Sequence, residues 1–480
     1  MSRSAHSIAV IGGGIAGLVA GTCLARTGRR VHLFESRPVL GGCCSTTSVS
    51  GYTFNNGALY LALPAILDEV FRALGLDRER LVPLARIIAP QSTYLPDGTV
   101  VTVGSDMELH VTTPGGRTYP IDVSHLVARW SPIMATFVAD LAARPYSLLR
   151  TLSHTWRYLP RLRGTVASEL ARQVPDRAAR SALAGLLLYS GLPPERTPVF
   201  QMVGLACLFA DGFYLPAGGM GQITAALATA LAASGAEIHV GRTVTRILAA
   251  DRRASALEVD GRDRLEFDAV ISAVSGMHTA RLLQDAAPPA LLRRAGRTPL
   301  SHQAVCVQLG LRNRLRAPSH SMSVLPWAEE MAGFFNQDGP ELRYLHYTVP
   351  TLTLPGLAPA GGSVIEMFPP IPQGLPASGW DDARIDSTAE RAIAALRRRH
   401  ELDVAVMRTI GPRQFQDDLG LYAGAAYGLS PAADMRALFP AVTSVPGLYQ
   451  AGQTSHPGYG VAPAAASGLI AARLLLDQRA

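Results

Sequence analysis

The sequence contains no lysine, so all 44 of its basic residues are arginine. No lysine side chain is available to form a Schiff base or to act as a general base. Long hydrophobic runs are also missing: no stretch of about eighteen residues is uniformly apolar, and a membrane-spanning helix is not expected. Cysteine is scarce, with five residues whose spacing fits neither a disulfide framework nor a zinc site. We therefore predict no metal site and, by default, a reducing cytoplasmic location.

Acidic residues are outnumbered by arginine, which gives the chain a formal net charge of +7. The arginines are dispersed and no nucleic-acid-binding motif accompanies them, so nucleic-acid binding is not expected. With 480 residues, the chain exceeds what one hydrophobic core usually supports, and we expect two domains.

A glycine-rich turn near the N-terminus has the pattern of a dinucleotide-binding unit. A short apolar run ends at Ile11, and the glycines of G-x-G-x-x-G follow as Gly12, Gly14 and Gly17. The first permits a tight turn, the second lets backbone N–H groups reach a pyrophosphate, and the third lets the helix pack close to the strand. Glu35 ends the second predicted strand, where a carboxylate accepts hydrogen bonds from ribose hydroxyls. This order of elements predicts a Rossmann-like unit with a bound dinucleotide.

The stretch after Glu35 resembles the second glycine motif of the FAD-dependent phytoene desaturase-like family, within the amine oxidase superfamily. It reads SRPVLGGCCSTTSVSGYTFNNGALYLALP, and its Gly41-Gly42 pair precedes a segment similar to G-[YF]-x-F-[DN]-x-G. In that family the glycine pair lies beside the ribityl and phosphate of the flavin, so the resemblance implies FAD as cofactor. Many relatives carry arginine after the pair, whereas Cys43 and Cys44 follow here. This variant is more similar to the carotenoid isomerase and retinol saturase branches, so isomerisation stays open beside desaturation.

Two later segments resemble the same family. One contains YLPAGGMGQI and leads to Val244, which matches the family position that contacts the adenine. Ala273 matches the position where a later strand passes the cofactor. The other runs from Pro446 to Leu476 and is similar to the closing motif L-Y-x-x-G-x-x-T/S-H-P-G-x-G-V, with a helix from Val461 whose N-terminus would point at the flavin. Spacing and resemblance together assign these FAD-binding residues: Gly12, Gly14, Ile15, Ala16, Gly17, Glu35, Ser36, Gly41, Gly42, Cys43, Val244, Ala273, Gly452, Val461 and Ala462.

The matched segments alternate with unmatched sequence, which implies a discontinuous FAD domain. We predict an α/β fold, with a Rossmann-like FAD-binding domain (GR2-type) and an inserted α+β substrate domain. The FAD-binding domain comprises residues 1–85, 213–290 and 421–480, and the substrate domain comprises residues 86–212 and 291–420.

The inserted regions contain two predicted helices with distinctive sequences. The segment from Arg144 to Arg163 holds five arginines and no acid, with leucines at helical spacing. Such a helix can lie on an anionic membrane surface, which would make the protein peripherally membrane-associated, or dock an acidic carrier protein. A substrate-domain helix with a solvated arginine face is the third interpretation. Further along, Ser387 and Glu390 fit a capping box that opens a helix ending at His400.

Few residues are candidates for acid–base chemistry. His456, in the closing motif, is predicted to stabilise charge in the transition state or to move a proton. A structural histidine bonded to nearby backbone is the alternative. Tyr459 is the second catalytic candidate and, with Tyr60 and Tyr427, is expected to face the flavin cavity, where plain packing is the alternative. Amine oxidases of the superfamily often place a lysine near the reactive flavin nitrogen, so the lack of lysine weakens the amine oxidase interpretation.

These features predict an FAD-dependent oxidoreductase that desaturates or isomerises a lipophilic polyene by hydride transfer to flavin. Three alternatives stay open. The first is a desaturase or oxidase that tailors a carrier-bound polyketide or other natural-product intermediate, and the second is a flavin amine oxidase. The third is a prenyl-binding escort protein that shares the fold without flavin. Glu35 and the Gly41-Gly42 pair count against the escort protein.

Overall fold

The computed structural model describes residues 6–478 except 105–107, 143, 338 and 434. Its centre is a parallel sheet of five strands whose middle strands are buried on both faces. Continuous apolar runs such as SIAVI suit this position because helices or a second sheet cover each face. In sheet order the strands are β11 (Glu237–Val240), β2 (Arg30–Glu35), β1 (Ser7–Ile11), β15 (Ala269–Ser272) and β21 (Leu448–Gln450).

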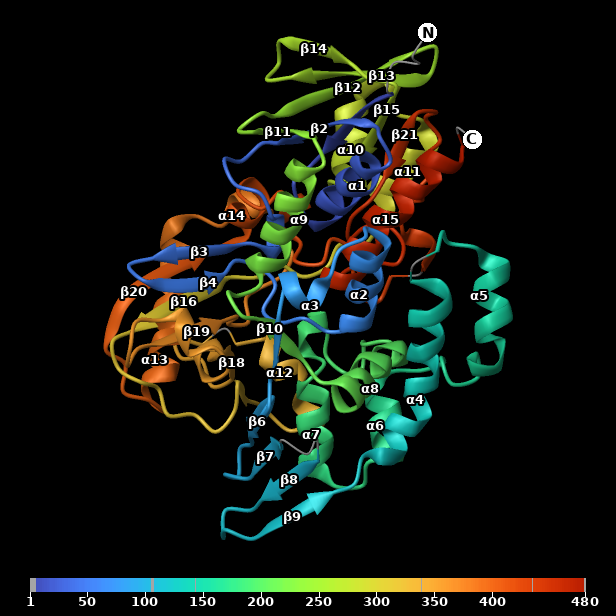
Figure 1. Ribbon diagram of the computed structural model, residues 1–480. Helices are drawn as coiled ribbons and strands as arrows, with labels where there is room; N and C mark the ends of the chain where they lie inside the picture. The colour runs from blue at the N-terminus through green and yellow to red at the C-terminus, as the bar shows by residue number, and fades with distance from the viewer. Residues whose placement is uncertain (1–5, 105–107, 143, 338, 434, 479–480) are drawn as a thin grey trace.

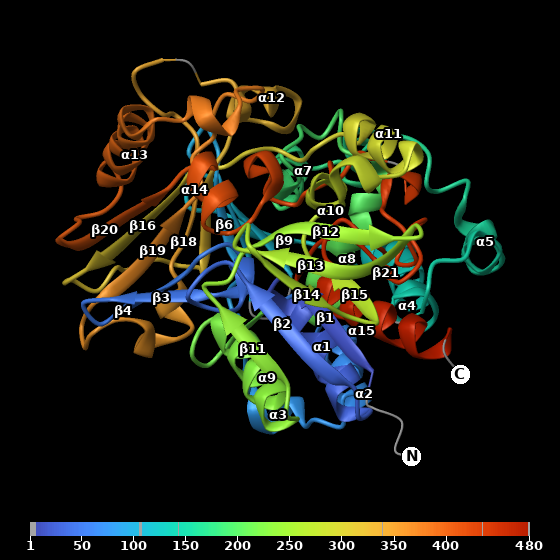
Figure 2. The same cartoon turned by 90° about the horizontal axis from the view of Figure 1, so that it is seen from above.

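Helices cover one face of this sheet and a small antiparallel sheet covers the other (Figures 1 and 2). The helices are α1 (Ile15–Arg26), α9 (Gly221–Ala233), α15 (Val461–Asp477) and, beside α15, α2 (Pro64–Ala73). The small sheet is formed by β12 (Val244–Ala250), β13 (Arg253–Val259) and β14 (Asp263–Glu266). Three separate stretches of chain therefore meet in one layered unit.

A second, mostly antiparallel sheet of nine strands forms the rest of the molecule. Its order is β20 (Val404–Ile410), β16 (Cys306–Leu311), β19 (Ser363–Met367), β18 (Leu345–Thr348), β17 (Ser321–Val324), β6 (Gln91–Tyr94), β7 (Val100–Val103), β8 (Leu109–Thr112) and β9 (Thr118–Ile121). The parallel pairing of β6 with β17 joins strands from two distant parts of the sequence. The predicted α/β fold with a Rossmann-like domain and an α+β region is confirmed, while the domain boundaries stay a prediction.

Helices pack on both ends of the nine-stranded sheet. One apolar cluster lies under α13 (Asp382–Arg397), and another lies between β7, β8 and a helical group. That group comprises α4 (Ser124–Thr136), α6 (Val166–Gln173), α7 (Arg177–Gly185) and α8 (Met202–Asp211). Further helices are α5 (Leu148–Thr155), α10 (Gly276–Leu283), α11 (Pro289–Arg297) and α14 (Pro412–Asp417). Two further strand pairs are β3 (Thr46–Val49) with β4 (Tyr52–Asn55), and β5 (Leu84–Arg86) with β10 (Tyr214–Pro216). Among the helices that the structure describes, none combines the length and apolarity needed to cross a bilayer.

The predicted start of the last substrate-region helix is wrong. Helix α13 runs from Asp382 to Arg397, and the Asp381 carboxylate accepts a hydrogen bond from the Arg384 N–H at 2.9 Å. The earlier residues join the helix because Ile385 is buried in the sheet-facing cluster. Ser387 therefore lies inside the helix rather than at its cap.

Candidate active site

The first glycine turn leaves an open space at the N-terminus of α1. Gly12 has φ +100°, which favours glycine, and a Cβ on Gly17 would lie 1.9 Å from the Gly12 carbonyl oxygen. Gly14 differs, because its φ of −72° and ψ of 177° suit any residue. A Cβ built on Gly14 meets no atom within 4 Å. Ile15 and Ala16 follow as buried first residues of the helix, so this space faces unpaired N–H groups, as an anion requires.

The second glycine motif lies directly against the first. The Gly41 N–H donates to the Gly13 carbonyl at 2.8 Å, and Gly41 and Gly42 have φ of +113° and +55°. A Cβ on Gly42 would lie 3.3 Å from the Gly14 Cα. Side chains at these positions would close the open space, so the two motifs form one backbone-lined cradle.

Glu35 lies at the carboxyl end of β2 and is buried. Its Oε2 accepts the Gly13 N–H at 2.8 Å, and its Oε1 accepts the Arg37 N–H at 3.0 Å and lies 3.3 Å from the Ser36 hydroxyl. Each carboxylate oxygen has further lone-pair capacity, so ribose hydroxyls can still donate to it. Ser36 itself is exposed.

The carboxyl ends of β1, β15 and β21 meet at the same edge. A Cβ on Gly452, which has φ +102°, would lie 3.2 Å from the Ala273 carbonyl oxygen. Val244 begins β12 and is buried in the cluster that also contains Phe34. Dinucleotides bind at this edge of parallel sheets, so the position of these residues fits the cofactor.

Helix α15 brings a second helix N-terminus to this edge. Val461 and Ala462 open it, after Gly460 with φ +101°. A Cβ on Gly468 would lie 2.2 Å from the Ala16 carbonyl oxygen, so α15 packs against α1 as closely as backbone atoms allow. Small residues along this helix make the close approach possible. The cradle, the buried carboxylate and two helix N-termini together fit a bound dinucleotide.

A cavity of about 400 Å³ begins beside this cradle and extends toward the nine-stranded sheet. Cys43, Gly460 and Val461 line its near end, and burial raises the pKa of the Cys43 thiol to about 11. Aliphatic and aromatic side chains dominate the rest. No aspartate, glutamate or arginine belongs to the described residues that line it. Its aromatic residues are Tyr60, Tyr189, Phe213, Phe334, Phe335, Phe368, Phe415, Tyr427 and Tyr459.

Tyr60, Tyr427 and Tyr459 all line this cavity. The rings of Tyr427 and Tyr459 lie 4.9 Å apart, and the Gln201 amide nitrogen donates to the Tyr459 hydroxyl at 3.1 Å. Tyr189, which the sequence did not single out, donates to the Gln201 carbonyl at 3.2 Å. Burial raises the pKa of Tyr60 and Tyr459 to about 12, so both phenols stay neutral near pH 7.

His456 lies elsewhere. It is buried, its ring centroid lies 5.6 Å from that of Tyr146, and it is not among the described residues that line the cavity. Its catalytic role stays a prediction. The histidines that do line the cavity are His302, His320 and His346, which sequence reasoning missed. Burial lowers the pKa of each to about 4, so all three are neutral near pH 7.

A buried polar network joins Asn55, at the end of β4, to the nine-stranded sheet. The Glu366 carboxylate accepts the Asn55 N–H at 2.6 Å, and the Gln308 amide donates to the Asn55 carbonyl at 2.6 Å. The Arg408 guanidinium donates to the side-chain amide oxygen of Gln308 at 2.5 Å. Burial raises the pKa of Glu366 to about 7. An acid inside the apolar strand SVIEM was the one sequence signal for this network.

Comparisons with known proteins agree with this geometry. The family model described as flavin containing amine oxidoreductase matches residues 15–476. The chain is 25% identical to the zeta-carotene-forming phytoene desaturase of Myxococcus xanthus, over 99% of this chain and 94% of the relative. It is also 25% identical to the 4,4'-diapolycopen-4-al dehydrogenase of Metabacillus indicus, over 95% and 94%.

Solved structures share the fold. An oxidoreductase from Methanosarcina mazei superposes with a TM-score of 0.67 at 17% identity, covering 98% of this chain and 100% of that one. Putrescine oxidase bound to putrescine gives a TM-score of 0.60 at 17% identity, with 98% and 99% covered. Because the family model spans nearly the whole chain and the cradle fits its cofactor, the protein belongs to the flavin containing amine oxidoreductase family and is an FAD-dependent oxidoreductase.

Proposed function

We propose that the protein desaturates or isomerises a lipophilic polyene. The observation that carries this proposal is the cavity beside the cradle, whose described lining contains aromatic and aliphatic side chains but no carboxylate or guanidinium. A protonated amine or a free carboxylate would enter it without a counter-ion, which is costly in an apolar site. A hydrocarbon chain incurs no such penalty. Relatives named as phytoene and diapophytoene desaturases support the same substrate class.

We further propose that the cradle residues hold the cofactor. When bound, FAD supplies the acceptor for a hydride from the substrate. The open space at Gly14 would take the pyrophosphate, Glu35 the ribose hydroxyls, and the N-terminus of α15 the flavin ring. The full proposed set is Gly12, Gly14, Ile15, Ala16, Gly17, Glu35, Ser36, Gly41, Gly42, Cys43, Val244, Ala273, Gly452, Val461 and Ala462.

The chain's own side chains would orient the substrate and keep water away. Tyr459 is fixed by Gln201 and stays a neutral phenol, so it acts by shape and by its hydroxyl dipole rather than as a base at neutral pH. The three cavity histidines are likewise uncharged near pH 7. Such a lining selects substrates by length and apolarity, which suits a polyene.

The substrate class is tested with the FAD-loaded protein. Phytoene and 4,4'-diapophytoene in liposomes should each be converted to a product, with absorbance at longer wavelength for desaturation or unchanged mass and altered retention for isomerisation. Putrescine and longer amines should leave the flavin oxidised under anaerobic conditions. Flavin reduction by amines without conversion of either polyene would refute the proposal and favour the amine oxidase alternative.

We also propose that α5 docks the protein on an anionic membrane, where a polyene would be dissolved. This helix stands on the outer flank of α4 (Figure 1) and is followed by a short helical turn, Trp156–Tyr158. Leu149 is 81% exposed and Trp156 67% exposed, beside the exposed arginine Arg157. Exposed leucine and tryptophan next to arginine are the pattern of a helix that lies on an anionic lipid surface, with its apolar side chains among the acyl chains and its arginines at the headgroups.

Changing Leu149 and Trp156 to glutamate together is expected to reduce binding to vesicles with anionic phospholipid at least about tenfold. Each side chain loses apolar burial of about 1.5–3 kcal/mol, and each added charge is repelled by the lipid. Met407→Glu is the matched control, since Met407 is 53% exposed on β20, on the opposite flank in both views (Figures 1 and 2). Vesicle sedimentation measures the effect. Equal binding by the double variant and the control would contradict docking through α5.

A further inference from the structure

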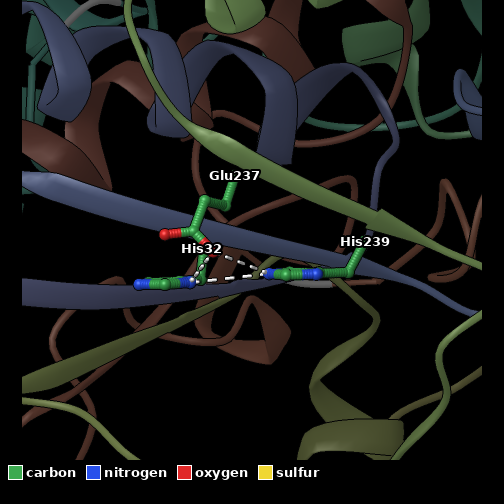
Figure 3. Close-up of side chains that lie close together, drawn as sticks. All are labelled: His32, Glu237 and His239. Atoms are coloured by element: carbon green, nitrogen blue, oxygen red, sulfur yellow. Dashed lines mark hydrogen bonds and ion pairs between the residues drawn. The ribbon is translucent and has the colours of Figure 1, made fainter.

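Two neighbouring strands of the central sheet bring together two histidines and a glutamate that do not line the cavity. His32 lies on β2 opposite Glu237 on β11 in the parallel register, and His239 follows two residues along the same strand. Side chains at paired positions and at every second residue share one face of a sheet. All three therefore point to the same place, as Figure 3 shows.

The spacing of their ligand atoms matches that of a bound metal ion. His32 Nδ1 lies 3.3 Å from Glu237 Oε2 and 3.5 Å from His239 Nε2, and the last two atoms are 3.8 Å apart. Tetrahedral zinc with ligands at about 2.0–2.2 Å separates them from one another by about 3.3–3.6 Å. Two of the three distances already have this value, and the third needs a small rotation of a side chain.

The two rings lie parallel to each other, with centroids 5.8 Å apart, and aromatic side chains pack against each of them. The His239 ring stacks on Phe34 with centroids 4.8 Å apart, and the His32 ring meets Phe267 edge-on at 5.4 Å. Arg30 is the nearby charge that opposes a cation. Glu237 is 56% exposed at its side chain, so an ion has an entry path and room for water as fourth ligand.

We propose that His32, Glu237 and His239 bind one divalent transition metal ion of the zinc class. Two imidazoles with one carboxylate suit this class, and the ion would fasten edge strand β11 to β2. The stabilising effect of the ion would extend to the cofactor cradle, because β2 and β11 both end beside it. The Arg242 N–H, just after β11, donates to the Glu35 carbonyl at 3.0 Å. The proposal is independent of the substrate class.

The test uses the full-length FAD-loaded protein, stripped with a chelator and titrated with zinc against a chromogenic competitor. We expect one zinc ion per chain and a zinc-dependent rise in melting temperature. His239→Gln should lose zinc affinity at least about tenfold, because one of three protein ligands is removed. His125→Gln is the matched control: His125 is an exposed histidine of α4 whose ring contacts the Gln173 carbonyl at 3.0 Å, and its removal should change neither readout.

A second variant protects the test against misfolding. Glu237→Gln alters a half-exposed side chain, so it should fold and retain FAD, while zinc affinity falls as in His239→Gln. Flavin content and circular dichroism establish that each variant is folded. Stoichiometric zinc uptake that both variants preserve would overturn the proposal. So would no uptake by the unaltered protein, which would identify the cluster as a hydrogen-bonded group only.

Discussion

Replacing Gly14 with valine is expected to weaken FAD binding at least about a hundredfold and to leave the fold intact. The backbone there has φ −72° and ψ 177°, which valine adopts readily, and a Cβ meets no protein atom within 4 Å. The new side chain would fill the space proposed for the pyrophosphate. Two lost hydrogen bonds to a charged group, at about 1.5–3 kcal/mol each, account for a hundredfold or more.

Two other glycines make this result specific. Gly17→Ala should destabilise the apoprotein itself, because its Cβ would lie 1.9 Å from the Gly12 carbonyl oxygen. Gly296→Val, in open space on α11, should change neither FAD affinity nor folding. Flavin titration by fluorescence and thermal unfolding without FAD measure the two effects separately. A Gly14→Val protein that purifies yellow and saturated with FAD would show that the pyrophosphate lies elsewhere.

The cofactor region, which contains Gly14 and Gly17, could be predicted from the sequence because its parts are close together along the chain. The glycine fingerprint, the strand before it and Glu35 lie within one short stretch of chain, so their spacing in the sequence is enough to predict how they are arranged. The Asp381 cap was missed for the opposite reason: burial of Ile385 against the sheet, and not the local Ser387–Glu390 pattern, decides where the helix begins. Local pattern could not reveal that outcome.

The cavity and the polar network required long-range information. Glu366 contacts Asn55, which lies 311 residues away, and the pair forms only when the β4 hairpin meets the nine-stranded sheet. His32 and His239 are 207 residues apart. His456 stands in a recognisable motif, whereas the histidines that line the cavity stand in no motif. Only the tertiary fold identifies the latter.

Acidification from pH 6.5 to 4 is expected to remove several kcal/mol from the free energy of unfolding, through His302, His320 and His346. Burial lowers their pKa values from 6.5 to about 4, so in this window the unfolded chain binds three protons that the native protein does not. The contribution of these neutral histidines to the free energy of unfolding is complete above pH 6.5 and is lost as the pH falls from 6.5 toward 4. Each contributes a slope of up to about 1.4 kcal/mol per pH unit.

Glu366 opposes this trend and supplies the control. Its pKa is raised from 4.5 to about 7, so between these values the native protein holds a proton that the unfolded chain has released. Its contribution therefore grows on acidification, by up to about 1.4 kcal/mol per pH unit, and the net slope of the four groups is about 2.7 kcal/mol per unit. Urea unfolding at several pH values should show a shallower acid dependence for His320→Gln and a steeper one for Glu366→Gln. The two substitutions should change the slope of the free energy of unfolding against pH in opposite directions. If both variants instead shift this free energy by a constant amount at every pH, the assignment of the slope to these residues is contradicted.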